Sequence, residues 1–389
     1  MERYDMYTKY CYDNETTRGW VEHRTHTHQN MNRLRVEKEK NTLCLPDKNI
    51  FHEAFMGGVY SQENVPVKLA FQREGLKKSK ELIENSDLDN TVQLNGEYVY
   101  LGQYRRHYGS FLIDSISRLW IAIDDPQKYK YIFLATQPEL GIGLHQSAIE
   151  FLKMFGIKEN QIVMVSEPTR VETLIIPEMS YVPLSHWHKE YLEIIHKVVG
   201  NVQKPTDYMP EKVYFSRSKF SSQLKSDFGE EIIVELFKSN GYAIIYPEEH
   251  TLSEQINYVN YCKVFASIGG SCAHNIIFSE TAPQMILFNR MNGYQFHQWF
   301  LNEMANVEPV TYVDAYNEPF KFLTKTNVNG PFLYMINKNV KKFAEDFKMI
   351  IPSISPYVYI RCLMRYTYYI LRKTLKECFM DLRHVLGGR

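Results

Sequence analysis

The chain has 389 residues, of which 44% are hydrophobic and 14% aromatic, so it can bury a sizeable core and global disorder is excluded. Its 45 basic and 45 acidic residues balance, and this absence of an overall basic field argues against a nucleic-acid partner. The six cysteines match neither a disulfide framework nor a zinc site, which favours reduced thiols in a cytoplasmic protein.

The N-terminal part, residues 1 to about 50, is polar and predicts no clear element. It lacks the apolar core of a signal peptide, and no apolar run anywhere is long enough to predict a spanning helix. His23, His26 and His28 lie close together in "HRTHTH", but no carboxylate or cysteine joins them at a metal-ligand spacing. We therefore expect a surface loop or strand there.

Between residues 97 and 177, short apolar runs alternate with segments of helical period. The predicted strands are 97–102, 130–135, 161–166 and 172–177, and the predicted helices are 110–123 and 147–157. Continuous apolar strands of this kind are typical of parallel sheets that are buried on both faces. The alternation predicts an α/β unit.

A second alternating series follows the polar, proline-containing segment 201–212, which we expect to be a linker. The predicted strands are 212–217, 242–247, 263–268 and 284–289, and the predicted helices are 229–241, 251–262 and 273–280. Thr251 and Glu254 form a capping-box pattern at the start of one helix. The expected fold class is thus α/β, with mostly parallel sheets in two domains, 1–203 and 204–335, and a helical tail, 336–389.

The tail is aromatic, basic and helical in period. From Arg361 to Arg389 there are seven Lys or Arg and two Asp or Glu residues. Such a helix either packs back over the first domain or contacts an anionic membrane surface.

The stretch "SIGGSCAHNIIFS" follows a predicted strand and contains Gly269, Gly270 and Ser271. Ligands of open α/β sheets bind at the carboxyl ends of strands, where glycine permits close approach and a helix N-terminus favours an anion. We expect a phosphate-binding turn, with His274 and Asn275 within reach of the ligand. The alternative is a tight turn whose glycines only serve packing.

Two further stretches of the sequence contain candidate binding or catalytic residues. In "VYFSRSK", Ser216, Arg217 and Lys219 end a predicted strand, and a basic cluster there suits a diphosphate unless it is a solvated turn.

In "RRHYGSFLIDSISRLW", Asp114 lies within an apolar helix and His107 precedes it. Asp114 is a candidate general base. The alternative is a structural pair between Asp114 and Arg118, four residues later.

The order "HYGSFLIDSISRLW", "VYFSRSK" and "GYAIIYPEEHTLSEQINYVNYCKVFASIGGSCAHNIIF" resembles glycosyltransferase family 61, in particular its bacterial branch of capsular polysaccharide biosynthesis proteins. The resemblance implies a GT-B architecture of two Rossmann-like domains facing across a cleft. It also implies a nucleotide-sugar donor, a glycan or lipid-linked glycan acceptor, inversion at the anomeric carbon, and no metal or other cofactor.

By the same resemblance, Arg217 and the Gly270 loop would hold the donor diphosphate, and Glu254 with Gln255 would support the nucleotide side. Asp114, or failing that His107, would be the base. Ser110 and Gly269 stand where many members have histidine.

Other functions remain as alternatives. One is a non-catalytic carbohydrate-binding or assembly partner in a polysaccharide-synthesis complex. A second is a metal-dependent transferase that uses Asp87-Leu88-Asp89 or Asp124-Asp125. A dinucleotide enzyme ranks last because no GxGxxG follows a first strand.

Overall fold

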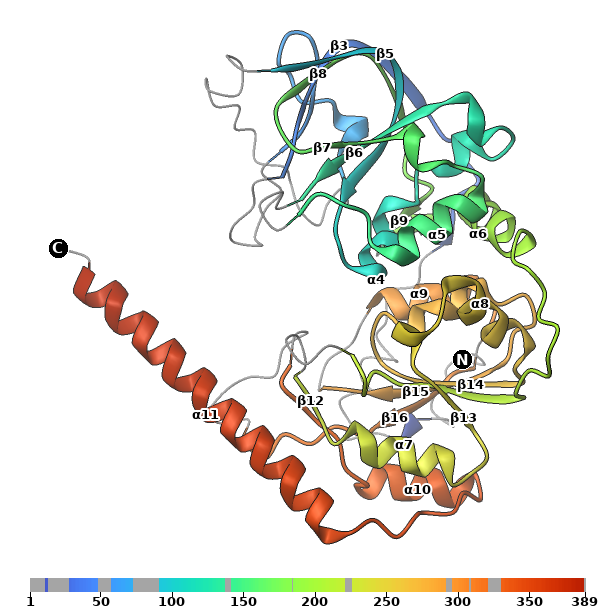
Figure 1. Ribbon diagram of the computed structural model, residues 1–389, viewed down its shortest axis with the longest axis vertical. Helices are drawn as coiled ribbons and strands as arrows, with labels where there is room; N and C mark the ends of the chain where they lie inside the picture. The colour runs from blue at the N-terminus through green and yellow to red at the C-terminus, as the bar shows by residue number, and fades with distance from the viewer. Residues whose placement is uncertain are drawn as a thin grey trace. The chain divides into compact units, whose positions relative to one another are not determined.

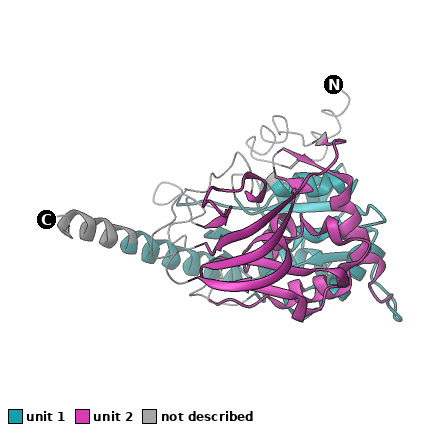
Figure 2. Ribbon diagram, turned by 90° about the horizontal axis from the view of Figure 1, so that it is seen from above, with its two compact units in different colours: residues 1–24, 205–389 teal, residues 25–204 magenta. Residues whose placement is uncertain are grey.

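The protein is described by a computed structural model that covers residues 11–12, 28–47, 57–72, 91–136, 141–183, 185–220, 226–291, 296–307, 309–320 and 330–387 (Figure 1). The chain forms two compact units (Figure 2). Unit 1 contains Met1–Arg24 and Pro205–Arg389, and unit 2 contains Thr25–Lys204. The start of the chain and the helical tail thus both belong to unit 1, which differs from the three consecutive segments expected from sequence.

Unit 2 is built on a six-stranded sheet with the order β4-β3-β8-β5-β6-β7. Its strands are β3 (Val36–Leu45), β4 (Gly58–Tyr60), β5 (Val92–Tyr104), β6 (Lys130–Ala135), β7 (Ile162–Val165) and β8 (Thr169–Pro177). β8, β5, β6 and β7 run parallel to one another, whereas β3 is antiparallel to both β8 and β4. The sheet is therefore mixed, because the polar N-terminal part, for which no element was predicted, supplies an antiparallel edge.

The remaining elements of unit 2 are α4 (Tyr108–Ser110), the π-helical turn η2 (Phe111–Ser115), the 3-10 turns η1 (Lys68–Ala70), η3 (Leu119–Ala122), η4 (Pro126–Lys128) and η6 (Glu159–Gln161), α5 (Gln146–Phe155) and α6 (Lys189–Gly200). A small sheet joins β2 (His28–Gln29), β10 (His186–Trp187) and β9 (Tyr181–Val182). α5 ends at Gly156 with φ +107°, as its sequence predicts.

The segment 110–123 is not the regular helix that its apolar spacing predicts. It is divided between α4, η2 and η3. Buried hydroxyls in it bond outside the segment, from Ser115 Oγ to the Gln103 carbonyl at 3.5 Å and from Ser117 Oγ to the Tyr181 carbonyl at 3.1 Å. These bonds tie the segment to neighbouring elements and compete with a regular helix.

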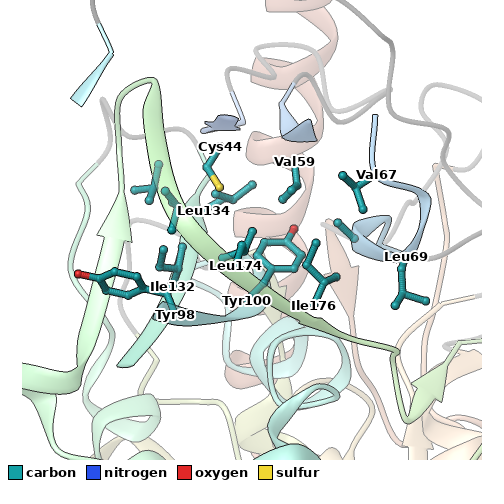
Figure 3. Packing of buried hydrophobic residues seen from close by; sticks show 13 residues of the cluster. Cys44, Val59, Val67, Leu69, Tyr98, Tyr100, Ile132, Leu134, Leu174 and Ile176 are labelled. Atoms are coloured by element: carbon teal, nitrogen blue, oxygen red, sulfur yellow. The ribbon is translucent and has the colours of Figure 1, made fainter. Parts of the chain in front are cut away.

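The core of unit 2 lies against the sheet. Figure 3 shows Tyr98 and Tyr100 of β5, Ile132 and Leu134 of β6, and Leu174 of β8 gathered there. All of these side chains are almost fully buried. Their packing fixes the strands whose carboxyl ends carry the candidate residues of this unit.

Unit 1 is built on a six-stranded, entirely parallel sheet with the order β1-β16-β15-β14-β11-β13. Its strands are β1 (Cys11–Tyr12), β11 (Lys212–Phe215), β13 (Ala243–Ile245), β14 (Val264–Ile268), β15 (Gln284–Asn289) and β16 (Thr311–Asp314). Its other elements are α7 (Glu230–Lys238), η7 (Pro247–Glu249), α8 (Leu252–Tyr261), η8 (Ala273–Phe278), α9 (Phe296–Met304) and α10 (Lys338–Asp346). In Figure 1, α8 and α9 cover one face of this sheet, and α7 and α10 cover the other. This is the layered α/β arrangement that the sequence predicts.

The tail forms one long helix, α11 (Pro356–Gly387). It packs beside the two-stranded pair β12 (Asp227–Phe228) and β17 (Phe332–Leu333). Cys362, Tyr366 and Ile370 of α11 are buried there. Within unit 1, these contacts hold the helix against β12 and β17.

Candidate active site

The candidate site of unit 1 lies where the order of its strands reverses. From β11, the chain continues to β13 on one side, whereas β14 continues to β15 and β16 on the other side. β11 and β14 are neighbours, and the Ser267 hydroxyl at the end of β14 donates a hydrogen bond to the Phe215 carbonyl at 3.3 Å. Such a reversal leaves a crevice at the carboxyl ends of the two strands, which is where open α/β sheets bind ligands.

Arg217 follows β11, and Gly270 follows β14. A Cβ atom added to Gly270 would lie 2.7 Å from Arg217 Nη1, and Gly270 has φ +148°. Only glycine suits both this conformation and this close approach. The structure therefore brings together the two turns that the sequence singled out.

Arg290, which follows β15, adds a second guanidinium that sequence reasoning did not assign. It is buried, and its Cζ lies 4.5 Å from the centroid of the Phe332 ring. Burial lowers the pKa of Arg290, and the positive charge of Arg217 lowers it further, so the two charges are close enough to repel. Arg290 makes no hydrogen bond to another described residue, and the negative charge of Asp227 offsets only part of the shift in its pKa.

Two acidic residues orient Arg217. Asp227 Oδ2 lies 3.8 Å from Arg217 Nε. Glu230 Oε1 accepts hydrogen bonds from the Arg217 backbone N–H at 2.7 Å and from the Ser216 hydroxyl at 2.9 Å. Burial alone would lower the pKa of Arg217, but the neighbouring negative charges, Asp227 foremost, raise it overall. Burial, with Asp227 nearby, raises the pKa of Glu230 to about 7.

Lys219 does not join this cluster. Its Nζ is bound to Glu249 at 3.0 Å and lies 4.0 Å from the centroid of the Tyr246 ring. Both members of this ion pair are about half exposed. The predicted contribution of Lys219 to a shared diphosphate site is therefore replaced by a surface ion pair.

The segment after Gly270 differs from the helix that was predicted. η8 is a 3-10 helix of six residues, so it lacks the α-helical N-terminus that the anion argument requires, and Ser271 lies in the turn before it. His274 Nδ1 shares a hydrogen bond with Gln298 Oε1 at 2.7 Å. Asn275 Nδ2 donates to Gln255 Oε1 at 2.9 Å. Both side chains are buried, and these bonds hold η8 against α9 and α8.

The predicted capping box at α8 is confirmed. The Thr251 hydroxyl accepts a hydrogen bond from the Glu254 backbone N–H, and Glu254 Oε2 accepts one from the Thr251 N–H at 2.7 Å. Gln255 Nε2 donates to the carbonyls of Pro247 and His250. The structure thus gives Glu254 and Gln255 local roles in holding α8 and the turn before it.

In unit 2, Asp114 and Arg118 do not form the pair that their spacing suggested. The guanidinium of Arg118, which is 1% exposed, donates to the carbonyls of Pro177 and Phe71 and lies against the Tyr100 ring. The π-helical turn η2 changes the helical spacing between positions 114 and 118. Asp114 itself is only 2% exposed.

His107 is exposed where the chain leaves β5, and its Nδ1 accepts a long hydrogen bond of 3.4 Å from the Ser110 N–H. A second histidine that was not predicted, His145, precedes α5, and its Nδ1 accepts from the Ala148 N–H at 3.0 Å. Burial lowers the pKa of His145 to about 4, and the charge of His107 contributes to this shift. The residues near the carboxyl end of β5 thus include two neighbouring imidazoles.

The residues of the proposed metal-dependent alternative do not gather into a ligand set in the described ranges. Asp125 Oδ1 accepts from the Gln127 N–H and caps η4. Asp87, Leu88 and Asp89 lie outside the described residues. Among the side chains that were described, no group of three or more His, Cys, Asp or Glu could hold a metal ion.

The fold is thus an α/β protein with two arginines at the switch point of a parallel sheet, an arrangement whose charge suits an anionic ligand. The family model described as Glycosyltransferase 61 matches residues 108–286, which include η2, β11 and β14. The resemblance to glycosyltransferase family 61 seen in the sequence is confirmed over this segment, whereas the bacterial branch stays a prediction.

Two solved structures are similar over much of the chain. The iron-containing dodecameric glycosyltransferase TibC from enterotoxigenic E. coli H10407 is 11% identical, with a TM-score of 0.26, over 70% of this chain and 85% of that chain. Dodecameric iron-containing heptosyltransferase TibC in complex with ADP-D-β-D-heptose is 10% identical, with a TM-score of 0.25, over 80% and 88%. No curated protein matches. At these TM-scores, the overall folds superpose only weakly.

Proposed function

We propose that the protein transfers a sugar from a nucleotide-sugar donor to a hydroxyl group of a glycan acceptor, with inversion and without a metal ion, in the synthesis of a bacterial surface polysaccharide. The match of residues 108–286 to the family model supports a glycosyltransferase. The main support for the donor site is that Arg217 and the buried Arg290 both lie against the turn at Gly269 and Gly270.

The charge balance of this cluster suits a diphosphate. Two guanidiniums face Asp227 and a Glu230 whose pKa is raised to about 7, so the site has a net positive charge at neutral pH. A nucleoside diphosphate would supply the acceptor oxygens that Arg290 lacks and would cancel the repulsion between Arg290 and Arg217. The donor site would thus form within unit 1 alone.

The reaction follows from this placement. The acceptor hydroxyl oxygen attacks the anomeric carbon, and the bond from that carbon to the diphosphate oxygen breaks with its electron pair. Arg217 and Arg290 stabilise the charge that grows on the leaving diphosphate. Loss of one well-placed group of this kind typically costs about 2.7–4 kcal/mol of transition-state stabilisation.

A base must take the proton of the attacking hydroxyl group. In a GT-B arrangement, the domain that binds the acceptor glycan, here unit 2, would supply this base. Asp114 and His107 were both candidates, and their exposure favours His107 because Asp114 is almost completely buried. His107→Ala would then lower kcat by about 10²–10⁴-fold without weakening donor binding. Equal activity in this variant and in the parent would overturn the assignment.

The test of the proposal is nucleotide binding by the full chain, measured by thermal shift and calorimetry with UDP, GDP, ADP and CMP, each with and without EDTA. We expect one nucleotide to bind regardless of EDTA, and Arg217→Ala to weaken it by at least about 100-fold. Lys219→Ala is the matched control, because this lysine is exposed and paired with Glu249.

Equal loss of nucleotide binding in Arg217→Ala and Lys219→Ala would contradict the proposed site. Binding of the nucleotide only when a metal is present would also contradict it. Binding of the nucleotide without turnover of any donor sugar would instead favour a non-catalytic carbohydrate-binding partner.

A further inference from the structure

The outer face of α11 carries an exposed apolar stripe. Its members are separated by three or four positions, which places them on one side of a helix. They are Tyr357, Ile360, Met364, Tyr368, Leu371 and Leu375, and each is between 57% and 68% exposed except Leu371, at 51%. Large apolar side chains gathered on one helical face usually mark a surface that contacts a partner or a membrane.

The opposite face of α11 is occupied by unit 1. Tyr366 packs against Phe228 of β12 with ring centroids 5.9 Å apart, and Arg361 Nη2 bonds Glu231 of α7 at 3.0 Å. Cys362 and Ile370 complete this buried face. These contacts fix the rotation of the helix, so the apolar stripe is directed away from the core that it packs on.

We propose that α11 binds the surface of an anionic lipid bilayer through the apolar stripe. From Pro356 to Lys376 the helix carries five basic residues, Arg361, Arg365, Arg372, Lys373 and Lys376, and no acidic residue. Apolar side chains beside lysine and arginine, with several tyrosines, are the features by which a helix lies in the headgroup region of an anionic membrane.

The charge pattern favours a lipid bilayer over a second copy of the chain as the partner of the apolar stripe. Two such helices packed stripe against stripe would bring their basic residues together, with no carboxylate in this segment to compensate. The helix would also lie on the bilayer rather than cross it. No helix in the described parts of the chain is long and apolar enough to span a membrane.

The experiment is flotation of the full-length protein with vesicles of phosphatidylcholine and phosphatidylglycerol, compared with vesicles of phosphatidylcholine alone. We expect binding only to the anionic vesicles. The triple variant Ile360→Ser/Met364→Ser/Leu371→Ser should lose at least about tenfold in apparent affinity, and Arg372→Glu/Lys376→Glu should lose a similar amount.

Leu363→Ser is the matched control, because this leucine lies on α11 but outside the stripe. It should bind as the parent does. Thermal unfolding and sedimentation of each variant accompany the flotation, and nucleotide binding, which is located at a different site, reports whether unit 1 is intact.

Any of the following results would overturn the proposal. The parent fails to float with anionic vesicles, or the triple variant floats as well as the parent. Alternatively, the parent forms a dimer that the triple variant abolishes, which would assign the stripe to a second copy. A large fall in unfolding temperature in the triple variant, without vesicle binding by the parent, would show that the chain itself covers the stripe.

Discussion

At the scale of single residues, Arg118 and Arg290 are both buried but have opposite surroundings. Arg118 donates to the carbonyls of Pro177 and Phe71, whereas Arg290 has no acceptor in the described part of the chain. A buried charge without a hydrogen-bond acceptor costs stability, and it is retained where a ligand supplies the acceptor. Arg290 is thus expected to serve binding and Arg118 to serve folding.

We therefore predict that Arg290→Met weakens binding of the nucleotide by at least about tenfold and leaves the free energy of unfolding unchanged or raises it by about 1 kcal/mol. Arg118→Met should instead lower the free energy of unfolding by about 2–5 kcal/mol, because two buried carbonyls lose their donors. Urea unfolding and calorimetry measure both quantities. Equal destabilisation by the two substitutions would show that Arg290 is structural.

At the scale of elements, the first turn of α7 holds the turn after β11 through Glu230. The raised pKa of Glu230 has a consequence for stability, because the folded protein keeps this proton between about pH 4.5 and 7 while the unfolded chain releases it. The free energy of unfolding should thus fall as pH rises through this window, by up to about 3 kcal/mol from this residue.

The variant Glu230→Gln has no titrating group at position 230, so its free energy of unfolding should not fall through this pH window. Urea unfolding at several pH values would measure this. Glu231→Gln is the matched control. Burial raises the pKa of Glu231, but hydrogen bonds from its own backbone N–H, Cys362 and Arg361 outweigh burial and lower the pKa overall. The contribution of Glu231 to stability is therefore present above pH 4.5 and is lost as pH falls below it. Its replacement should lower stability across pH 5–8 without changing the slope. A parent slope that survives in Glu230→Gln would refute the assignment.

The elements also show what sequence alone can predict. β6 and β15 have the predicted bounds, because continuous apolar runs between polar turns have few alternatives. The irregular segment of η2 could not be predicted, since its shape depends on bonds of Ser115 and Ser117 to distant carbonyls. Within the site, the turns at Arg217 and Gly270 could be read from local sequence. Arg290 became visible only once the strand order placed it beside them.

At the scale of the whole molecule, unit 1 is not one continuous stretch of chain. Its sheet ends with β1, whose Cys11 and Tyr12 pair with Tyr312 and Val313 of β16. Without β1, β16 would become an exposed edge strand with buried apolar residues, which is a template for association. The arginine site, on β11, β14 and β15, does not include β1.

We predict that deletion of Met1–Arg24 increases self-association, measured by sedimentation velocity, with little change in nucleotide binding. Cys11→Pro/Tyr12→Pro in the full chain is the matched variant, because proline disrupts strand pairing but keeps the rest of the segment. Both changes should act in the same direction. Monodisperse behaviour equal to that of the parent in both would show that β1 is dispensable.

The position of β1 also sets an order of events during biosynthesis. Tyr312 is made 301 residues after its partner Cys11 (312 − 11). The whole of unit 2, Thr25–Lys204, leaves the ribosome in this interval and can fold as a domain. Cys11 and Tyr12 therefore have no partner strand until β16, the last strand of the parallel sheet, has been translated. During that time they are available to chaperones.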